Sequence, residues 1–131
     1  MKLIGSNQIV ILGTWYLLKY TLVDQEGRRK DIAEGIKGQL VYTQDGSVSV
    51  VIVLTSPVDR TSQMNTICYS GRYRFEDENI VHEIYVSDKS SYINSSQVRS
   101  IDISNNILTL TAPPIAGVTH IVRWQRTEFK A

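Results

Sequence analysis

Apolar and polar residues alternate along short segments that follow one another through the chain. The segments are rich in Val, Ile, Thr and Tyr, and Gly, Pro, Asp and Asn gather between them. This composition, with period-two alternation, is typical of β-strands. Residues 29–36 are the one stretch for which we predict a short helical turn. The pattern predicts eight strands, at residues 14–23, 38–44, 47–54, 66–75, 80–87, 95–103, 107–111 and 118–126.

The connections between these strands are mostly short, which predicts that neighbours in sequence are also neighbours in the sheet. The Asp45-Gly46 pair lies between two apolar runs and is a strong hairpin signal, because both residues tolerate a positive φ. Eight antiparallel strands joined up-and-down can close into a barrel, which removes the sheet edges and leaves room for side chains or one small ligand. A β-sandwich is the alternative, but the consecutive short turns favour an all-β, eight-stranded antiparallel barrel.

Length and composition fit one ordinary domain over residues 1–131. The chain is 42% hydrophobic and 21% charged, which excludes a disordered chain, and its net charge of +1 gives no reason to expect a nucleic-acid or membrane partner. The lone cysteine, Cys68, cannot form an internal disulfide, which fits a reducing compartment. Residues 1–15 lack the apolar run and cleavage site of a signal peptide, and no stretch approaches the length of a spanning helix. We therefore expect a soluble cytoplasmic protein.

Two short motifs mark the strands that meet where a barrel closes. They are Gly13-Thr14-Trp15 near the N-terminus and Arg123-Trp124-Gln125-Arg126 near the C-terminus. An arginine on the last strand can stack on the indole of the first and hydrogen-bond the chain at the closed end. We predict Trp15, Trp124 and Arg126 as structural closure residues. Together with the strand count, these residues resemble the calycin superfamily, which includes lipocalins and fatty-acid-binding proteins.

A closer resemblance covers residues 13–126 and is to the bacterial and fungal lipocalin-like domain proteins of about this size. Its most specific part is the combination of Tyr69-Ser70-Gly71-Arg72-Tyr73 with Gln97-Val98-Arg99. The resemblance implies a calycin-type barrel around a pocket for an apolar or amphipathic small molecule. In one respect the chain departs from that family, because residues 56–65 are shorter than the often helical lid that joins the third and fourth strands there. The other matching segments are residues 13–15, 40–46, 108–114 and 122–124.

Strand parity predicts which side chains face the interior, because alternate residues of a strand point to opposite sides of the sheet. On the last strand, the face that carries Arg126 is taken as interior, because Arg126 is predicted to stack on Trp15. On the other strands, the more apolar face is taken as interior. The predicted interior sets are Ile67, Tyr69, Gly71, Tyr73 and Phe75; Ile80, His82, Ile84 and Val86; Gln97, Arg99, Ile101 and Ile103; and Val118, His120, Val122, Trp124 and Arg126.

Arg99 is the most informative of these residues, because a buried guanidinium without a partner is very costly. Its charge needs a carboxylate, such as Glu83 or, in a different register, Asp102, or the anion of a ligand. In the fatty-acid-binding barrels that the chain resembles, an interior arginine holds the ligand carboxylate. Two interpretations stay open at this point: a ligand anchor, and a structural hydrogen-bonding or stacking role.

Tyrosines and histidines complete the predicted site. Three of the seven tyrosines fall on inner faces, where their hydroxyls can orient the polar end of a ligand or their rings can simply fill space. The two histidines can serve as an acid or base, or as satisfied core residues. No third ligand accompanies them at metal spacing, so we predict no metal and no cofactor. The predicted ligand-binding residues are Tyr42, Tyr69, Tyr73, His82, Gln97, Arg99 and His120.

The sequence thus predicts a small-molecule-binding barrel that holds an apolar or amphipathic ligand in its interior. The alternative is a cofactor-independent isomerase or cyclase of secondary metabolism, in which the pocket positions a reactive substrate and leaves almost no sequence motif. The sequence contains no nucleophile elbow, phosphate loop or paired-cysteine motif, and it leaves open whether the chain is an enzyme. We expect a monomer or a weak homodimer with no nucleic-acid or membrane partner.

Overall fold

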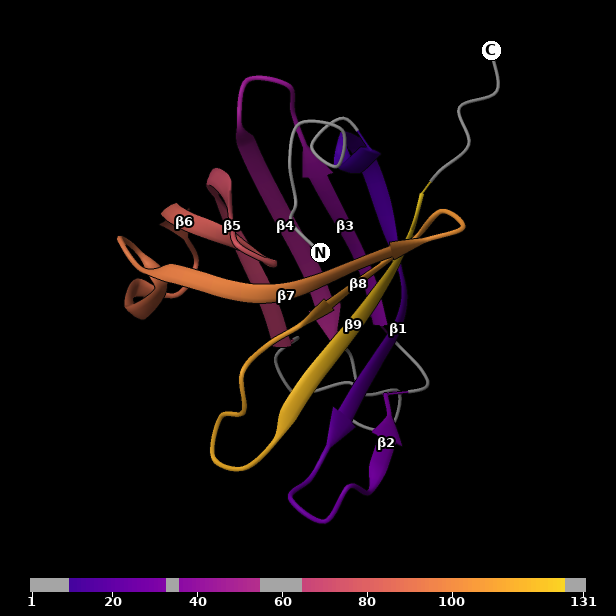
Figure 1. Cartoon of the computed structure of the whole chain (residues 1–131). Helices are drawn as coiled ribbons and strands as arrows, with labels where there is room; N and C mark the ends of the chain where they lie inside the picture. Colours follow the sequence, from indigo (N-terminus) through magenta and orange to yellow (C-terminus); the bar gives the residue numbers. More distant parts are fainter. Residues whose placement is uncertain (1–9, 33–35, 55–64, 127–131) are drawn as a thin grey trace.

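The computed structural model describes residues 10–32, 36–54 and 65–126. These residues form one antiparallel sheet with the strand order β2-β1-β3-β4-β5-β6-β7-β8-β9 (Figure 1). Within the described chain, no helix is long and apolar enough to cross a bilayer. The elements are β1 (Gly13–Val23), β2 (Arg29–Asp31), β3 (Ile36–Tyr42), β4 (Ser47–Leu54), β5 (Asn65–Glu76), β6 (Asn79–Ser87), the 3-10 helix η1 (Ser90–Tyr92), β7 (Ser96–Ser104), β8 (Ile107–Thr111) and β9 (Thr119–Arg126).

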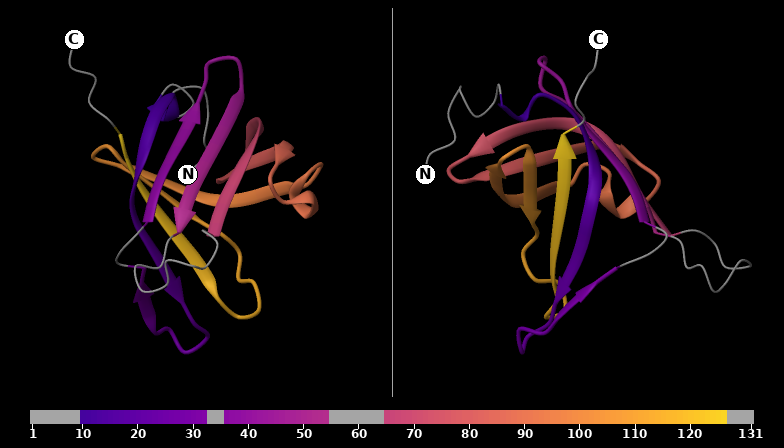
Figure 2. Two further views of the ribbon diagram at one scale, coloured as in Figure 1. Left: turned by 180° about the vertical axis from the view of Figure 1, so that it is seen from behind. Right: turned by 90° about the vertical axis from the view of Figure 1, so that its right-hand side faces the viewer.

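The sheet closes on itself because β1 also pairs with β9. This ladder runs from Trp15 opposite Arg126 to Val23 opposite Thr119, and Figure 2 shows the yellow β9 beside the indigo β1. The short strand β2 pairs with the last residues of β1, on the edge of β1 opposite to β9. The wall of the barrel is therefore made of the eight antiparallel strands β1 and β3 to β9, which confirms the predicted fold class.

The helical turn predicted at residues 29–36 is wrong. Arg29–Asp31 form the strand β2 and Ile36 begins β3, while residues 33–35 lie outside the described chain. The reason lies in the preceding turn, where the Asp24 carboxylate accepts backbone N–H groups of Glu26 and Arg28 at 3.0 and 2.9 Å. This Asx-type turn reverses the chain and directs it back along β1.

The hairpin between β3 and β4 lies where the Asp45-Gly46 signal places it, but its turn differs from the predicted one. The N–H of Gly46 donates to the carbonyl of Thr43 at 3.2 Å, and the N–H of Thr43 donates to the carbonyl of Ser47 at 3.0 Å. Of the pair, Gly46 has a positive φ of 91°, whereas Asp45 does not. The loop is thus a longer turn ending in a left-handed glycine rather than a two-residue turn with two positive φ values.

A bulge in β1 changes which of its side chains face the interior. The pairing with β9 shifts register between Leu17 and Lys19, and the extra residue, Leu18, is exposed. Beyond the bulge the alternation is reset, so Tyr20 is buried although it lies an odd number of residues from the buried Trp15.

A second bulge, in β6, makes one predicted interior position wrong. The pairing with β5 shifts between Ser70 and Gly71, which leaves Tyr85 without a direct partner. Val86, predicted to face inward with Ile84, is 51% exposed because the extra residue turns it to the outside.

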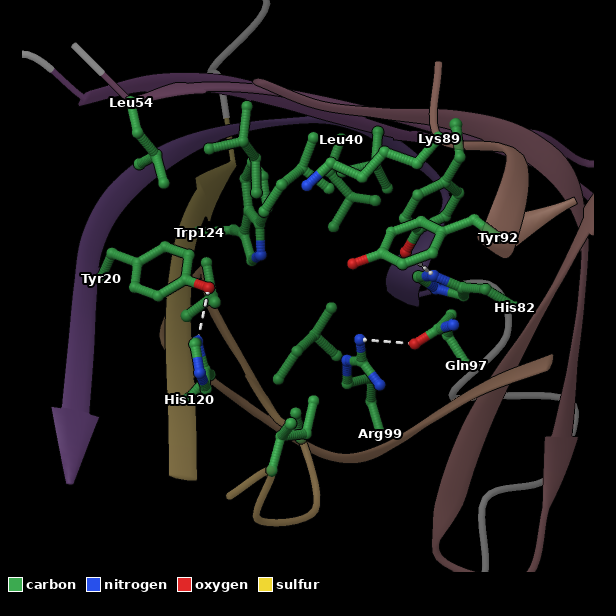
Figure 3. A pocket seen from close by; sticks show the side chains of 18 residues that line it. Tyr20, Leu40, Leu54, His82, Lys89, Tyr92, Gln97, Arg99, His120 and Trp124 are labelled. Atoms are coloured by element: carbon green, nitrogen blue, oxygen red, sulfur yellow. Dashed lines mark hydrogen bonds between the residues drawn. The ribbon is translucent and has the colours of Figure 1, made fainter. Parts of the chain in front are cut away.

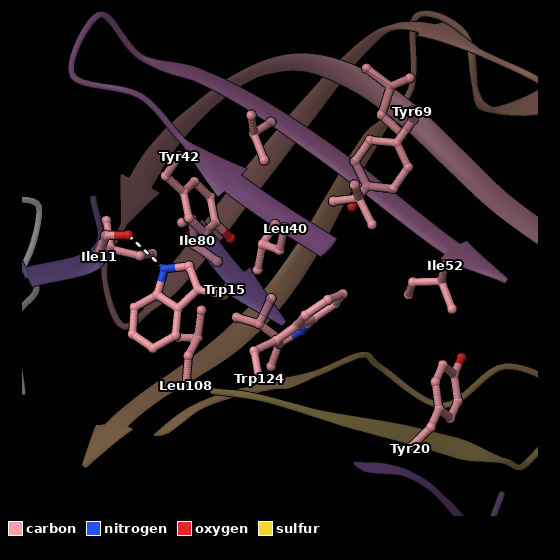
Figure 4. Packing of buried hydrophobic residues seen from close by; sticks show 14 residues of the cluster. Ile11, Trp15, Tyr20, Leu40, Tyr42, Ile52, Tyr69, Ile80, Leu108 and Trp124 are labelled. Carbon is pink, nitrogen blue, oxygen red and sulfur yellow. Dashed lines mark hydrogen bonds between the residues drawn. The ribbon is translucent and has the colours of Figure 1, made fainter. Parts of the chain in front are cut away.

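The hydrophobic core fills one end of the barrel, which we call the closed end. Trp15, Leu40, Ile80 and Leu108 are completely buried there. Their strands meet at this end, as the pairing of Trp15 in β1 with Leu40 in β3 shows. In Figure 4, Leu40, Ile80 and Leu108 form one cluster with Trp15 and Tyr42. The dense packing of large side chains leaves the interior space at the other end of the barrel.

Arg126 clamps the seam at the closed end. Its guanidinium lies over the Trp15 ring, 4.2 Å from the ring centroid, and donates hydrogen bonds to the carbonyl oxygens of Leu12 and Val10. The indole N–H of Trp15 donates in turn to the carbonyl of Ile11 at 2.9 Å. The last strand is thereby tied both to the first strand and to the chain that precedes it.

Candidate ligand-binding site

The end of the barrel opposite the clamp encloses a cavity of about 310 Å³ (Figure 3). Aliphatic side chains from several strands make up much of its wall, and a smaller set of polar side chains projects into it. An apolar wall with a few polar groups is typical of small-molecule pockets. The aliphatic residues are Leu40, Val50, Ile52, Leu54, Ile67, Leu110, Ala112, Ile115 and Val122. The other lining residues are Tyr20, Tyr69, His82, Lys89, Tyr92, Gln97, Arg99, His120 and Trp124.

The structure brings most of the predicted ligand-binding residues together at this cavity, and places two of them elsewhere. Tyr69, His82, Gln97, Arg99 and His120 line the cavity. Tyr42 and Tyr73 do not. They pack edge-to-face at the closed end with ring centroids 4.9 Å apart, and the hydroxyl of Tyr73 donates to a backbone carbonyl in the β3–β4 loop at 3.0 Å.

Arg99 faces neutral acceptors rather than a carboxylate. Its Nη1 donates to the carbonyl of Val98 at 2.8 Å, and its Nη2 donates to Oε1 of Gln97 at 3.1 Å. Glu83 and Asp102, the carboxylates that the sequence offered as partners, are both exposed on the outer face of the barrel. Within the described chain, the charge of Arg99 is therefore left without an ion-pair partner, and it faces the cavity.

His82 lies between two tyrosines at the base of the cavity. Its Nε2 is 2.7 Å from the hydroxyl of Tyr42, and its Nδ1 is 2.6 Å from the hydroxyl of Tyr69. Burial, assisted by the positive charge of Arg99, lowers the pKa of His82 to about 3. The imidazole is therefore neutral near pH 7, and it joins the two tyrosines into one hydrogen-bonded chain.

A second tyrosine–histidine pair lies on the wall formed by β1 and β9. The hydroxyl of Tyr20 is 2.8 Å from Nδ1 of His120. Partial burial lowers the pKa of His120, and the charge of Arg99 acts in the same direction. On another side of the cavity, the ammonium group of Lys89 lies 5.6 Å from the centre of the Tyr92 ring. Arg99 and Lys89 give the lining two positive charges, whereas both histidines are held toward their neutral forms.

Comparison with known proteins bears on the fold. No protein-family model and no curated protein matches the sequence. Among solved structures, a lipocalin-like protein from Bacteroides uniformis matches with a TM-score of 0.52 and 16% identity, covering 89% of this chain and 98% of that one. The fold is lipocalin-like. A redesigned β-barrel matches as well, with a TM-score of 0.52, 15% identity, and 92% and 95% of the two chains covered. These matches confirm the lipocalin-like resemblance at the level of the fold.

The lipocalin-like barrel also brings to its cavity residues that the sequence did not single out. Tyr20 reaches the interior through the bulge at Leu18, and no residue pattern marks that bulge. Lys89 and Tyr92 come from the irregular connection around η1, where strand parity gives no information. The apolar alternation along β3 and β4 was a usable signal for the aliphatic wall of the cavity.

Trp124 lines the cavity and takes no part in the Arg126 clamp. It is 2% exposed, and its Nε1–H has no hydrogen-bond acceptor in the part of the chain that the structure describes. In Figure 3 the indole nitrogen lies on the ring edge that faces Arg99 and His120. Of the three predicted closure residues, Trp15 and Arg126 form the clamp, and Trp124 has a different environment.

Across residues 10–32, 36–54 and 65–126, no group of three or more His, Cys, Asp or Glu side chains is arranged to hold a metal ion. The segment 56–65, shorter than the lid of the lipocalin-like family, lies outside the described residues apart from Asn65 at the start of β5.

Proposed function

We propose that this lipocalin-like barrel binds one small amphipathic molecule, with its anionic head group at Arg99 and its apolar body against the aliphatic wall. The observation that carries the proposal is the charge of the cavity. Arg99 and Lys89 line it, and no acidic side chain is among its described lining residues. A cavity with cations and no counter-charge favours an anion, and its aliphatic wall favours a hydrocarbon body.

The surroundings of Arg99 support its role as the anchor. Its two hydrogen bonds, to the carbonyl of Val98 and the side chain of Gln97, fix the guanidinium but leave further N–H donors for a carboxylate. Burial is the main cause of the lowered pKa values of His82 and His120, and the charge of Arg99 adds to the shift of both, so its field reaches both histidines. A bound carboxylate neutralises the charge of Arg99 in a partly dry site, where charged pairs are stronger than in water.

The second candidate function, a cofactor-independent isomerase or cyclase, is favoured by the chain of hydrogen bonds from Tyr42 through His82 to Tyr69. Such a chain ends on the cavity and can in principle hand a proton to a substrate. Burial raises the pKa of Tyr69 and lowers that of His82, so neither group exchanges a proton readily near pH 7. The two pKa shifts therefore favour a binding function over acid–base catalysis.

The test removes the charge of Arg99 and keeps its length. We expect Arg99→Met to raise the Kd for decanoate at least tenfold, about 1.4 kcal/mol or more, and to leave the Kd for decan-1-ol within about twofold. Both Kd values are measured by isothermal titration calorimetry. The reason is that the alcohol fills the same apolar space without needing the guanidinium.

Lys30→Met is the matched control, since it removes one positive charge from the exposed strand β2. It should leave both affinities unchanged, because surface charges distant from the cavity are screened by salt. Equal losses for the acid and the alcohol in Arg99→Met, or no loss for either, would show that Arg99 serves packing alone.

A further inference from the structure

The unpartnered indole N–H of Trp124 is the first of two observations on the polarity of the cavity. Trp124 is 2% exposed and lines the cavity, and its Nε1–H finds no acceptor among the described residues. A buried donor without an acceptor destabilises a protein, and native structures rarely keep one without a use. The other tryptophan, Trp15, follows the usual rule, because its Nε1–H donates to the carbonyl of Ile11.

The second observation is the direction of the hydrogen bonds around His82. A neutral imidazole has one donor and one acceptor nitrogen, so one of its two tyrosines donates to it and the other accepts from it. The hydroxyl of Tyr42 is fully buried and has His82 as its sole partner in the described chain. If Tyr42 accepted from Nε2–H, its own proton would have no acceptor there.

The arrangement that satisfies Tyr42 fixes the rest of the chain. Tyr42 donates to Nε2 of His82, and Nδ1–H of His82 donates to the hydroxyl oxygen of Tyr69. The hydroxyl proton of Tyr69 then has no acceptor within the chain of hydrogen bonds. Because Tyr69 lines the cavity, that proton is available to a group inside it. Trp124 and Tyr69 thus both offer a hydrogen-bond donor that the described protein leaves unused.

We propose that the ligand carries, besides its anionic head, neutral hydrogen-bond acceptors on its body, such as keto or ester oxygens, placed to accept from Trp124 and from Tyr69. This rests on the proposed function, since it assumes that a small molecule occupies the cavity. It assigns the ligand to the class of oxygenated amphipathic acids rather than plain alkyl acids. A site with buried donors discriminates against a molecule that leaves them unpaired, and this discrimination exceeds what an apolar wall gives for one added carbon.

The test compares decanoate with a set of decanoates that carry one keto group at successive positions along the chain. The keto series keeps the head group and nearly the same shape, so a difference in Kd reports the acceptor. We expect at least one keto acid to bind at least tenfold more tightly than decanoate. Trp124→Phe, which keeps an aromatic ring and removes the N–H, should abolish most of the advantage of the keto acid whose oxygen reaches Trp124, measured as the ratio of the Kd values for decanoate and for that keto acid in the same variant.

Two further variants complete this comparison. Tyr69→Phe removes the hydroxyl donor and should reduce the advantage of the keto acids whose oxygen reaches Tyr69. Tyr85→Phe is the matched control, because Tyr85 is 79% exposed on the outer face and its hydroxyl lies away from the cavity. It should leave every affinity unchanged.

A measurement on the unmodified protein keeps the proposal testable if Trp124→Phe does not fold. The chain has two tryptophans, so indole ¹⁵N labelling gives two Nε1–H signals. The keto acid that binds best should move the Trp124 proton signal downfield and slow its exchange with solvent, relative to decanoate. The Trp15 signal, already hydrogen-bonded inside the closed end, is the internal reference and should stay in place.

The outcomes separate this inference from the proposed function. This inference is overturned, and the anion anchor stands, if decanoate binds through Arg99 but every keto acid binds only as tightly as decanoate. The same conclusion follows if the keto advantage persists in both Trp124→Phe and Tyr69→Phe. If carboxylates do not bind but the neutral ketone decan-2-one does and shifts the Trp124 signal, the anchor fails and this inference stands. If none of these molecules binds, both are overturned.

Discussion

At the scale of single residues, polar groups inside the barrel are arranged by what each can donate or accept. His82 is 1% exposed, yet both of its ring nitrogens are satisfied by tyrosine hydroxyls. Arg99 is held by neutral acceptors and keeps its charge free for the cavity. The sequence predicted the inward position of both residues from strand parity. It could not predict their partners, because a hydrogen bond between distant strands depends on register and rotamer rather than on local pattern.

Burial of the neutral His82 should make the protein less stable in acid. The pKa of His82 is about 3 in the folded protein and has its ordinary value of about 6.5 in the unfolded chain. Between these values the unfolded chain binds a proton that the folded protein does not. The stabilisation is therefore complete above pH 6.5 and is lost as the pH falls toward 3. We expect the free energy of unfolding to drop by about 3 kcal/mol between pH 7 and pH 4 from this residue, measured by urea denaturation.

The comparison with His82→Gln isolates this contribution, because several aspartates with lowered pKa values, such as Asp31 and Asp88, also weaken the fold in acid. The variant should be less stable at pH 7 but should have a shallower dependence on pH. His120→Gln is the matched control at the half-buried histidine. Parallel curves for the wild type and His82→Gln would mean that the pKa of His82 is the same in the folded protein as in the unfolded chain.

At the scale of strands, the sequence predicted the number and order of the barrel strands but not their irregularities. The eight apolar segments correspond to β1 and β3 to β9, because period-two alternation reflects burial on one face. The bulges at Leu18 and Tyr85 add one residue each and reverse the facing beyond them. Nothing in the local composition marks these insertions, so parity placed Val86 inside and gave no reason to place Tyr20 there. The strand β2 was missed for a related reason, since three polar residues carry no alternation.

Gly71 shows what one of these irregularities requires of the sequence. A Cβ at this position would lie 1.9 Å from the carbonyl oxygen of Glu83 in β6, so the backbones of β5 and β6 approach each other more closely than any side chain allows. We expect Gly71→Ala to lower the free energy of unfolding by about 3 kcal/mol or more, measured by chemical denaturation.

Gly27→Ala is the matched control for this prediction. Gly27 has a φ of 81°, but a Cβ there would meet nothing within 4 Å. Its replacement should cost about 1 to 2 kcal/mol from backbone conformation alone. A loss in Gly71→Ala no larger than that in Gly27→Ala would indicate that β5 and β6 separate at the bulge more easily than the close approach implies.

At the scale of the whole molecule, the barrel has two ends with different tasks. The closed end holds the fully buried Trp15, Ile80 and Leu108 and the Arg126 clamp. The other end holds the cavity, whose lining comes from strands on every side of the barrel. A ligand in the cavity thus contacts the assembled barrel, while the clamp stabilises the seam that closes it. This division predicts that stability and binding can be changed separately.

Arg126→Met tests this division. It keeps much of the aliphatic length of the side chain but removes the guanidinium that stacks on Trp15 and binds the carbonyl groups of Leu12 and Val10. We expect a loss of about 2 to 4 kcal/mol in the free energy of unfolding, because a cation–π contact and two hydrogen bonds at a half-buried seam are lost together. The Kd for decanoate should change by less than about twofold at a temperature where the variant is fully folded.

Arg123→Met, on the same strand, is the matched control and should cost less than about 1 kcal/mol, as is usual for partly exposed charges. If Arg126→Met weakened decanoate binding tenfold while Arg123→Met did not, the seam and the cavity would be coupled, and the closed end would have to be counted as part of the binding site.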